Sequence, residues 1–146
     1  MEWEIIPFVG MGPIRFGMSP ADVASLVGAP ETTDNRPNGI REFHAVDLPV
    51  VAYENGAVTE IEAFYDVKNV TFRGRNIFEE GGLAILRFLE RENAGASLDV
   101  GIVMFERVGI TAGRLDEKAR GDHSITAFAK GLWDDSLEDF TAKSFV

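Results

Sequence analysis

Residues 12–30 read GPIRFGMSPADVASLVGAP, and this stretch predicts a short helix with both of its ends marked in the sequence. Ser19 is a good N-cap, and Pro20 occupies the first helical position, where its missing N–H costs nothing. Asp22 falls in the first turn, where a negative charge interacts favourably with the helix dipole. Gly28 is placed to end the helix, and a proline two residues later prevents the helix from restarting.

Strand signals follow this helix. Residues 31–39 (ETTDNRPNG) are expected to form a polar loop, and residues 41–46 a strand. The dipeptide Asn55-Gly56 lies between two alternating runs, residues 50–53 and 57–65, and is the best short signal of a β-hairpin. The first half of the chain therefore predicts antiparallel strands after a helix.

A second helix and further strands are predicted in the second half. Apolar residues recur on one side of residues 78–93, but Gly81-Gly82 is a defect that costs about 1 kcal/mol per glycine relative to alanine. The reliable part of this helix is therefore residues 83–92. Three strands are expected after it, at residues 100–106, 108–115 and 125–132. The acidic tail from Trp133 either packs back on the body or forms an aromatic and acidic contact surface.

Two segments of the chain align when the sequence is offset by 52 residues. Residues 50–54 (VVAYE) then lie on residues 102–106 (IVMFE), and each segment follows a predicted helix. One interpretation is that any two hairpins look alike. The other is a duplicated unit of a helix and a meander, with sub-repeats 1–73 and 74–146.

Both interpretations predict the same fold class. Strand pairs this close in sequence leave no room for parallel crossovers. We therefore expect an α+β fold in a single domain, residues 1–146, with short helices packed on an antiparallel β-sheet.

The composition excludes several classes of function. Lys and Arg total 14 and Asp and Glu total 24, and the net charge of −10 argues against nucleic acid and against anionic membranes as partners. The absence of Cys excludes disulfides, thiolate nucleophiles and cysteine metal sites. The first residues contain no basic region followed by an apolar run, and no apolar stretch is long enough to span a membrane, so we expect a cytoplasmic protein.

Catalytic signals are weak, and we expect no enzyme activity, cofactor or metal. His44 and His123 are the only histidines, and a surface or packing role is favoured for each. The sequence has no G-x-S-x-G motif and no phosphate-binding glycine motif. The acidic groups at residues 116–122 and 134–139 lack EF-hand spacing. Paired carboxylates for glycosidase chemistry stay open, because such partners need not be near in sequence.

Residues 12–30 also resemble the signature R-x-G-M-S-x-x-x-V-x-x-x-x-G-x-P. This signature opens small bacterial domains similar to the β-lactamase inhibitor protein and the BamE/SmpA outer-membrane assembly lipoproteins. The resemblance implies a helical segment on a small antiparallel sheet, sometimes twice in tandem, and a module that binds other proteins through its sheet face and loops. The chain lacks the lipobox and disulfide cysteines of these families, so neither specific activity is carried over.

The acidic charge has two interpretations. It is spread over the chain, with a net of −6 in residues 1–73 and −4 in residues 74–146, as solubility alone would produce. Alternatively, it matches a basic partner, because nuclease toxins are basic and bacterial immunity proteins are often small, acidic and non-enzymatic. The predicted contact patch combines sheet and tail residues: Glu54, Glu60, Glu62, Trp133, Asp134, Asp135, Glu138 and Asp139. We expect Glu60 and Glu62 to face water on a one-sided sheet.

Three hypotheses about function follow. The first is a non-enzymatic protein-binding inhibitor, most concretely an acidic immunity protein that neutralises a basic bacterial effector toxin. The second is a small-ligand-binding or enzymatic domain with its pocket between helix and sheet. The third is an assembly or scaffold module.

Overall fold

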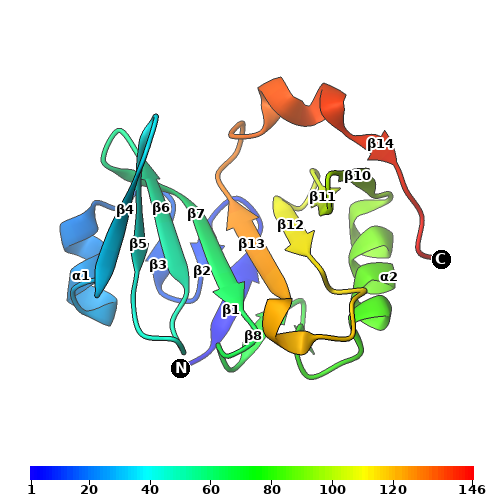
Figure 1. The fold of residues 1–146 in the computed structure, drawn as a ribbon, viewed down its shortest axis with the longest axis horizontal. Helices are drawn as coiled ribbons and strands as arrows, with labels where there is room; N and C mark the ends of the chain where they lie inside the picture. Colours follow the sequence, from blue (N-terminus) through cyan, green and yellow to red (C-terminus); the bar gives the residue numbers. More distant parts are fainter.

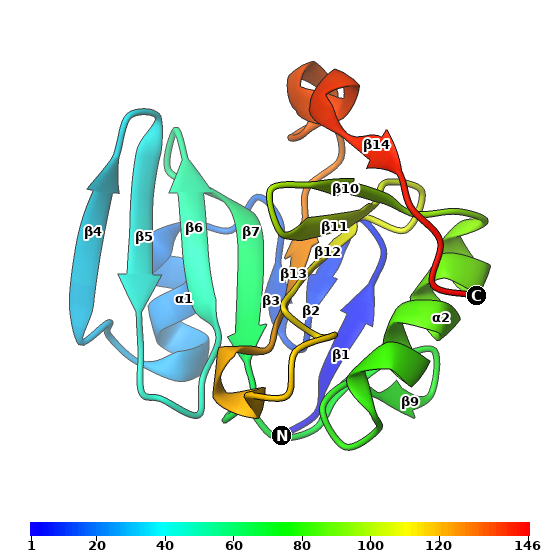
Figure 2. The same cartoon turned by 45° about the vertical axis from the view of Figure 1, so that its right-hand side comes forward.

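Two β-sheets make up most of the molecule, and the computed structural model describes all 146 residues (Figures 1 and 2). The smaller sheet has the strand order β3-β2-β1-β8-β9. Its five strands are short: β1 (Trp3–Ile6), β2 (Gly10–Met11), β3 (Ile14–Arg15), β8 (Val70–Phe72) and β9 (Arg75–Asn76). Strands β1 and β8 run parallel, and the other pairs are antiparallel.

The larger sheet is antiparallel throughout, in the order β14-β10-β11-β12-β13-β7-β6-β5-β4. Its nine strands are β4 (Thr32–Arg36), β5 (Gly39–Phe43), β6 (Val50–Glu54), β7 (Ala57–Phe64), β10 (Ser97–Asp99), β11 (Ile102–Phe105), β12 (Ile110–Gly113), β13 (Ser124–Phe128) and β14 (Thr141–Ala142). Strands β4 to β7 form one meander and β10 to β13 another, and the two meanders meet where β7 pairs with β13. The predicted α+β class is confirmed.

Helix α1 (Pro20–Val27) begins as predicted. The Asp22 backbone N–H donates to the Ser19 hydroxyl oxygen at 3.1 Å, and the Ser19 backbone N–H donates to the Asp22 carboxylate at 3.1 Å. These two bonds form a capping box, which satisfies two backbone donors at the helix start. The helix ends at Gly28, whose φ of 89° favours glycine. Two short 3₁₀ helices, η1 (Arg120–Asp122) and η2 (Asp134–Asp139), lie in the second half.

Helix α2 (Gly82–Asn93) contains all of the reliable part predicted, residues 83–92, but it does not reach back to residue 78, so the glycine pair marks its start and is not a defect within it. Gly81 is the N-cap, and Gly82 packs directly on the backbone of Leu115. A Cβ atom at position 82 would lie 1.6 Å from the Leu115 carbonyl oxygen. Glycine is therefore required at position 82 because a neighbouring chain segment approaches the helix start closely.

Residues 31–39 do not form the predicted polar loop. Residues Thr32–Arg36 are the edge strand β4, whose side chains are all exposed. The strand pairs with β5 over its whole length, from Thr32 opposite Phe43 to Arg36 opposite Gly39. Hydrogen bonds to a neighbouring strand outweigh the polar composition, and charged side chains are typical of a protected edge.

Three other predicted strands have shifted bounds. The strand expected at residues 41–46 runs over Gly39–Phe43 instead. The strand expected at 100–106 is β11, Ile102–Phe105, and Val100, 92% exposed, lies in the turn that joins it to β10. The last predicted strand ends at Phe128, before the tail begins. Only the tertiary pairing distinguishes these turns from strand interiors.

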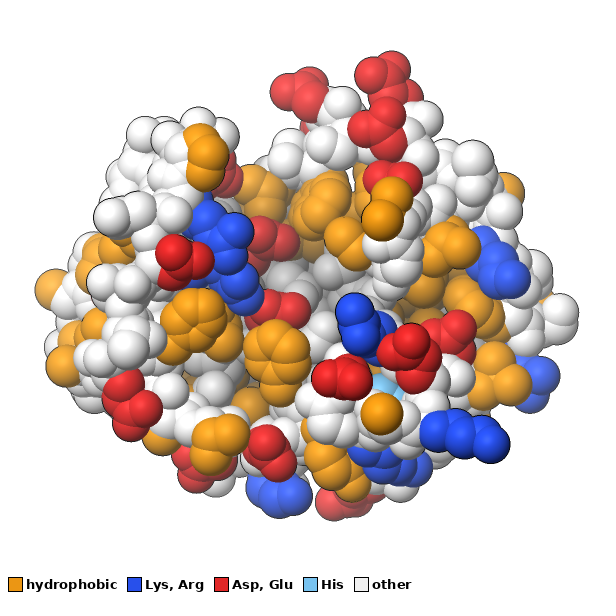
Figure 3. All heavy atoms as spheres, in the orientation of Figure 1, with side chains coloured by type: hydrophobic (Ala, Val, Ile, Leu, Met, Phe, Trp, Pro, Cys, Tyr) orange, Lys and Arg blue, Asp and Glu red, His pale blue; other side chains and the backbone are white.

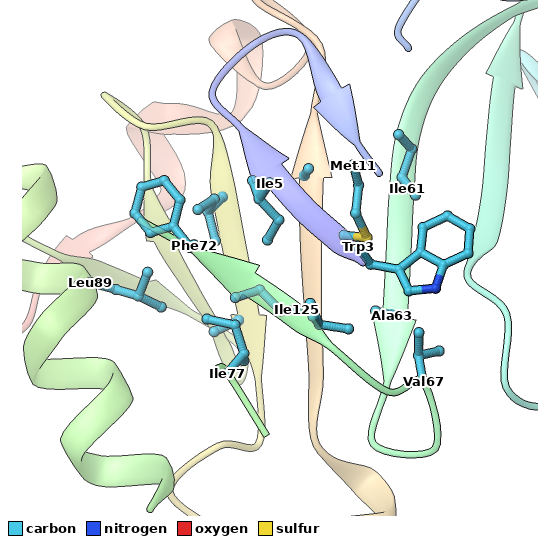
Figure 4. Close-up of a cluster of buried hydrophobic side chains, with 14 of the residues drawn as sticks. Trp3, Ile5, Met11, Ile61, Ala63, Val67, Phe72, Ile77, Leu89 and Ile125 are labelled. Carbon is cyan, nitrogen blue, oxygen red and sulfur yellow. The ribbon is translucent and has the colours of Figure 1, made fainter. Parts of the chain in front are cut away.

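The core lies between the two sheets and α2. Figure 4 shows Trp3, Ile5 and Met11 from the smaller sheet among Ile61 and Ile125 from the larger sheet. Buried residues of α2, such as Leu89 in the same view, complete a single cluster of 27 buried residues. One face of the larger sheet is therefore covered in this region, and alternate side chains of the same strands point to its other face.

Candidate functional site

A groove with a volume of about 540 Å³ lies on the open face of the larger sheet. Strands β4 to β7 and β11 to β13 contribute its lining residues, and Trp133, just before η2, lines its edge. Figure 3 shows this hollow between the β4–β5 side of the molecule and η2, with charged and apolar side chains exposed within it. Strand β7 supplies two of the charged side chains, Glu60 and Glu62, which alternate with core residues of the same strand.

Glu62 has a cationic partner in the groove. The Arg41 Nη2 atom, from β5, lies 2.5 Å from the Glu62 Oε1 atom, and the Arg41 guanidinium also lies over the Phe43 ring at 5.2 Å. The side chain of Arg41 reaches across β6, where Ala52 is its register partner and leaves room for it. Burial raises the pKa of Glu62, and the charge of Arg41 lowers it in part.

Glu60 has no such partner. None of the five ion pairs in the structure involves its carboxylate. Burial raises the pKa of Glu60, and the negative charge of Glu62 raises it further. The indole N–H of Trp133 and the charge of Arg41 lower this pKa in part, although the buried Nε1 atom of Trp133 completes no hydrogen bond. Glu60 is therefore only partly compensated and has no ion pair of its own.

Aromatic packing holds Trp133 in place at the groove edge. Its ring centroid lies 6.3 Å from that of Phe128 and 6.0 Å from that of Phe140, in edge-to-face arrangements. Phe128 belongs to β13, and Phe145 is partly buried against the core. The first alternative for the tail, that it packs back on the body, is confirmed.

The structure divides the predicted contact patch into two neighbouring parts. One part lines the groove: Glu54, Glu60, Glu62 and Trp133. The other part is exposed on η2: Asp134, Asp135, Glu138 and Asp139. In Figure 3 acidic side chains gather over η2, above the groove. Glu60 and Glu62 lie on the open face of the sheet, as expected, but both side chains are half-buried in the groove.

Sequence reasoning missed the arginines of the groove. Arg36 and Arg41 both line it, beside the hydroxyl groups of Thr111, Ser124 and Thr126. Glu42 is buried and accepts a hydrogen bond of 2.8 Å from the Tyr53 hydroxyl, which turns Arg41 to the open face. The sequence shows that side chains of β5 alternate, but it does not show which of the two sets faces the groove.

Neither histidine lies in the groove. His123 is buried, and its Nε2 atom lies 2.6 Å from the Glu117 carbonyl oxygen. His44 is also buried, and neither of its ring nitrogens has a hydrogen-bond partner. No three or more His, Asp or Glu side chains are grouped so that they could hold a metal ion. Neither helix is both long and apolar enough to cross a membrane.

The groove does not lie where a helix-and-sheet pocket was expected. Core side chains of β1, β7, β13 and α2 pack together on the covered side of the larger sheet, and the groove opens on the other side. Comparisons with protein families, with curated proteins and with solved structures find no match. The resemblance over residues 12–30 therefore stays a prediction.

Proposed function

We propose that this protein is a non-enzymatic inhibitor that binds a basic protein in the groove of its larger sheet. The most concrete form of this proposal is a cytoplasmic immunity protein that neutralises a bacterial effector toxin. The observation that carries it is an open groove across several strands that contains a half-buried carboxylate, Glu60, which takes part in no ion pair. A partly compensated charge in such a place costs stability, and a complementary partner would remove that cost.

Charge on and beside the groove supports a basic partner. Two arginines and three glutamates line it, and four exposed acidic residues of η2 stand next to it, which leaves five formal negative charges. A surface of one dominant sign raises the rate of encounter with a partner of the opposite sign. The aromatic residues Trp133 and Phe140 add the kind of side chain that anchors protein interfaces.

A small-ligand site in the same groove is the second candidate. The volume of about 540 Å³ is in the range of ligand pockets, and the partly buried carboxylates Glu60 and Glu62 are polar groups that could orient a ligand. We favour the protein partner because the charged surface continues beyond the groove onto η2.

We also propose that the two halves of the chain are duplicated units. Each helix is followed by four antiparallel strands, β4 to β7 and β10 to β13. In the β6–β7 hairpin Tyr53 is opposite Val58, and in the β11–β12 hairpin Phe105 is opposite Ile110, which is the same pairing after the offset of 52 residues. A duplication would explain how two short meanders join into one sheet wide enough for the groove.

The proposed function is tested by capture of partners from the source cells at low and high salt, read by mass spectrometry. The wild-type protein is compared with Glu60→Lys, which reverses the groove charge, and with Glu4→Lys, which makes the same change at an exposed position on β1. We expect one stoichiometric basic partner with the wild type and Glu4→Lys, and its loss with Glu60→Lys. No partner, or equal capture by Glu60→Lys, would contradict the proposal.

A further inference from the structure

The two glutamates of β7 are not equivalent. Glu62 is held by Arg41 at 2.5 Å, and Thr126 of β13 is its register partner. Glu60 lies between Ala52 of β6 and Phe128 of β13 in the sheet register, so neither of its cross-strand neighbours offers a hydrogen-bonding side chain. The groove therefore has one carboxylate in an ion pair, Glu62, and one without an ion pair, Glu60.

The Trp133 indole N–H acts on the Glu60 carboxylate without completing a hydrogen bond to it. The Nε1 atom of Trp133 is buried and has no hydrogen-bond partner, and its indole ring is fixed between Phe128 and Phe140. A buried polar atom without a partner is uncommon and calls for an explanation. The indole and the Glu60 carboxylate line the same groove, and together they offer an aromatic surface and a negative charge.

We propose that Glu60 and Trp133 form the anchoring subsite for one arginine side chain of the protein partner. This inference rests on the proposed function and specifies the group that the groove recognises. A planar guanidinium can donate two parallel hydrogen bonds to the Glu60 carboxylate and also stack on an indole ring. The Thr126 hydroxyl in the same groove can accept a further guanidinium N–H.

Other cations fit this subsite less well. A divalent metal ion needs several oxygen ligands, and no three acidic or histidine side chains are grouped to supply them. A lysine ammonium lacks the planar fork and stacks less well on an aromatic ring. A second copy of this chain has a net charge of −10, so the acidic surface would repel it. A basic polypeptide that presents an arginine is the occupant with complementary charge and shape.

The test is an NMR titration of the ¹⁵N-labelled protein with the capped tripeptide acetyl-Gly-Arg-Gly-amide. The same tripeptide with citrulline is the matched control probe, because citrulline has the shape of arginine without its charge. The signals to follow are the Trp133 indole N–H and the backbone amides of β7. We expect saturable shifts with the arginine peptide and at least about tenfold weaker binding of the citrulline peptide. The same tripeptide with lysine in place of arginine should bind more weakly than the arginine peptide.

Two variants locate the binding. Glu60→Gln keeps the shape of the side chain and should weaken binding of the arginine peptide at least about tenfold, whereas Glu4→Gln on β1 should leave it unchanged. The amide spectra of both variants show whether they fold as the wild type does. Equal binding of the arginine and citrulline peptides, no saturable shift in the groove, or unchanged binding by Glu60→Gln would overturn the inference. The proposed function would survive that result if Glu60→Lys still lost the captured protein partner.

Discussion

Glu60 makes the free protein less stable than it could be. Burial raises its pKa in the folded state, so folding favours its protonated form. The free energy of unfolding therefore falls as the pH rises from the ordinary pKa of a glutamate to the raised pKa of the folded state, and above that window the loss is complete. Residues that serve a partner often carry such a cost in the free protein.

The substitution Glu60→Gln should consequently stabilise the protein at neutral pH. We expect the free energy of unfolding to rise by about 0.5 to 2 kcal/mol, because a partly buried charge without an ion pair is removed. The gain should vanish below about pH 4, where Glu60 is protonated in both states. Urea unfolding at the two pH values measures both effects, with Glu4→Gln as the control at an exposed site. A loss of stability at neutral pH would show that Glu60 is already compensated.

Helix α2 depends on two contacts that its own sequence does not reveal, one at each end. At its start Gly82 lies against the Leu115 carbonyl group. Near its end Glu90 accepts hydrogen bonds from the Ser144 hydroxyl at 2.8 Å and from the Phe145 backbone N–H at 2.6 Å. The C-terminal segment is thereby attached to α2, next to the short strand β14 that follows η2.

Alanine substitutions at the two glycines before and at the start of α2 are expected to have different effects on stability. Alanine at a helix position is normally favoured over glycine by about 1 kcal/mol. We expect Gly82→Ala to do the opposite and lower the free energy of unfolding by at least about 2 kcal/mol, because its Cβ would collide with the Leu115 backbone. Gly81→Ala, which meets no atom within 4 Å, should cost less than about 1 kcal/mol. Chemical denaturation measures both, and equal effects would contradict the close approach.

The attachment of the C-terminal segment can be tested on the same helix. Glu90→Ala should lower the free energy of unfolding by about 1 to 3 kcal/mol, because it removes the carboxylate that accepts both hydrogen bonds. The backbone amide of Phe145 should then exchange faster with solvent. Glu92→Ala removes only an exposed ion pair with Arg73 and should cost no more than about 1 kcal/mol. Unchanged exchange at Phe145 in Glu90→Ala would show that other contacts hold the segment.

Across the whole molecule, the features that could be predicted were those with local causes. The capping box of α1 and the Asn55-Gly56 turn depend on neighbouring residues, and both central residues of that turn have positive φ, 53° and 76°. The edge strand β4 was missed because only its pairing with β5 makes its polar residues extended. The position of Arg41 was missed because the buried Glu42–Tyr53 hydrogen bond, which joins two strands, sets the phase of β5.

The net charge of −10 leads to a prediction about how the proposed basic partner associates. Attraction between an acidic groove and a basic protein should accelerate association, and salt should screen it. We expect the association rate constant to fall about tenfold or more between low and physiological ionic strength, with a smaller change in the dissociation rate. Surface plasmon resonance at several salt concentrations measures both rates. An association rate that does not depend on salt would show that electrostatic attraction does not accelerate binding of the partner.

Hydrogen exchange of the free protein and of its captured complex tests most directly whether the groove is the interface. We predict slower exchange in the complex for backbone amides of β7, β13 and η2, and no change in the smaller sheet or α1. This pattern would place the partner on the open face of the larger sheet. Protection confined to α1 or to the smaller sheet, with exchange in the groove unchanged, would contradict the proposed interface.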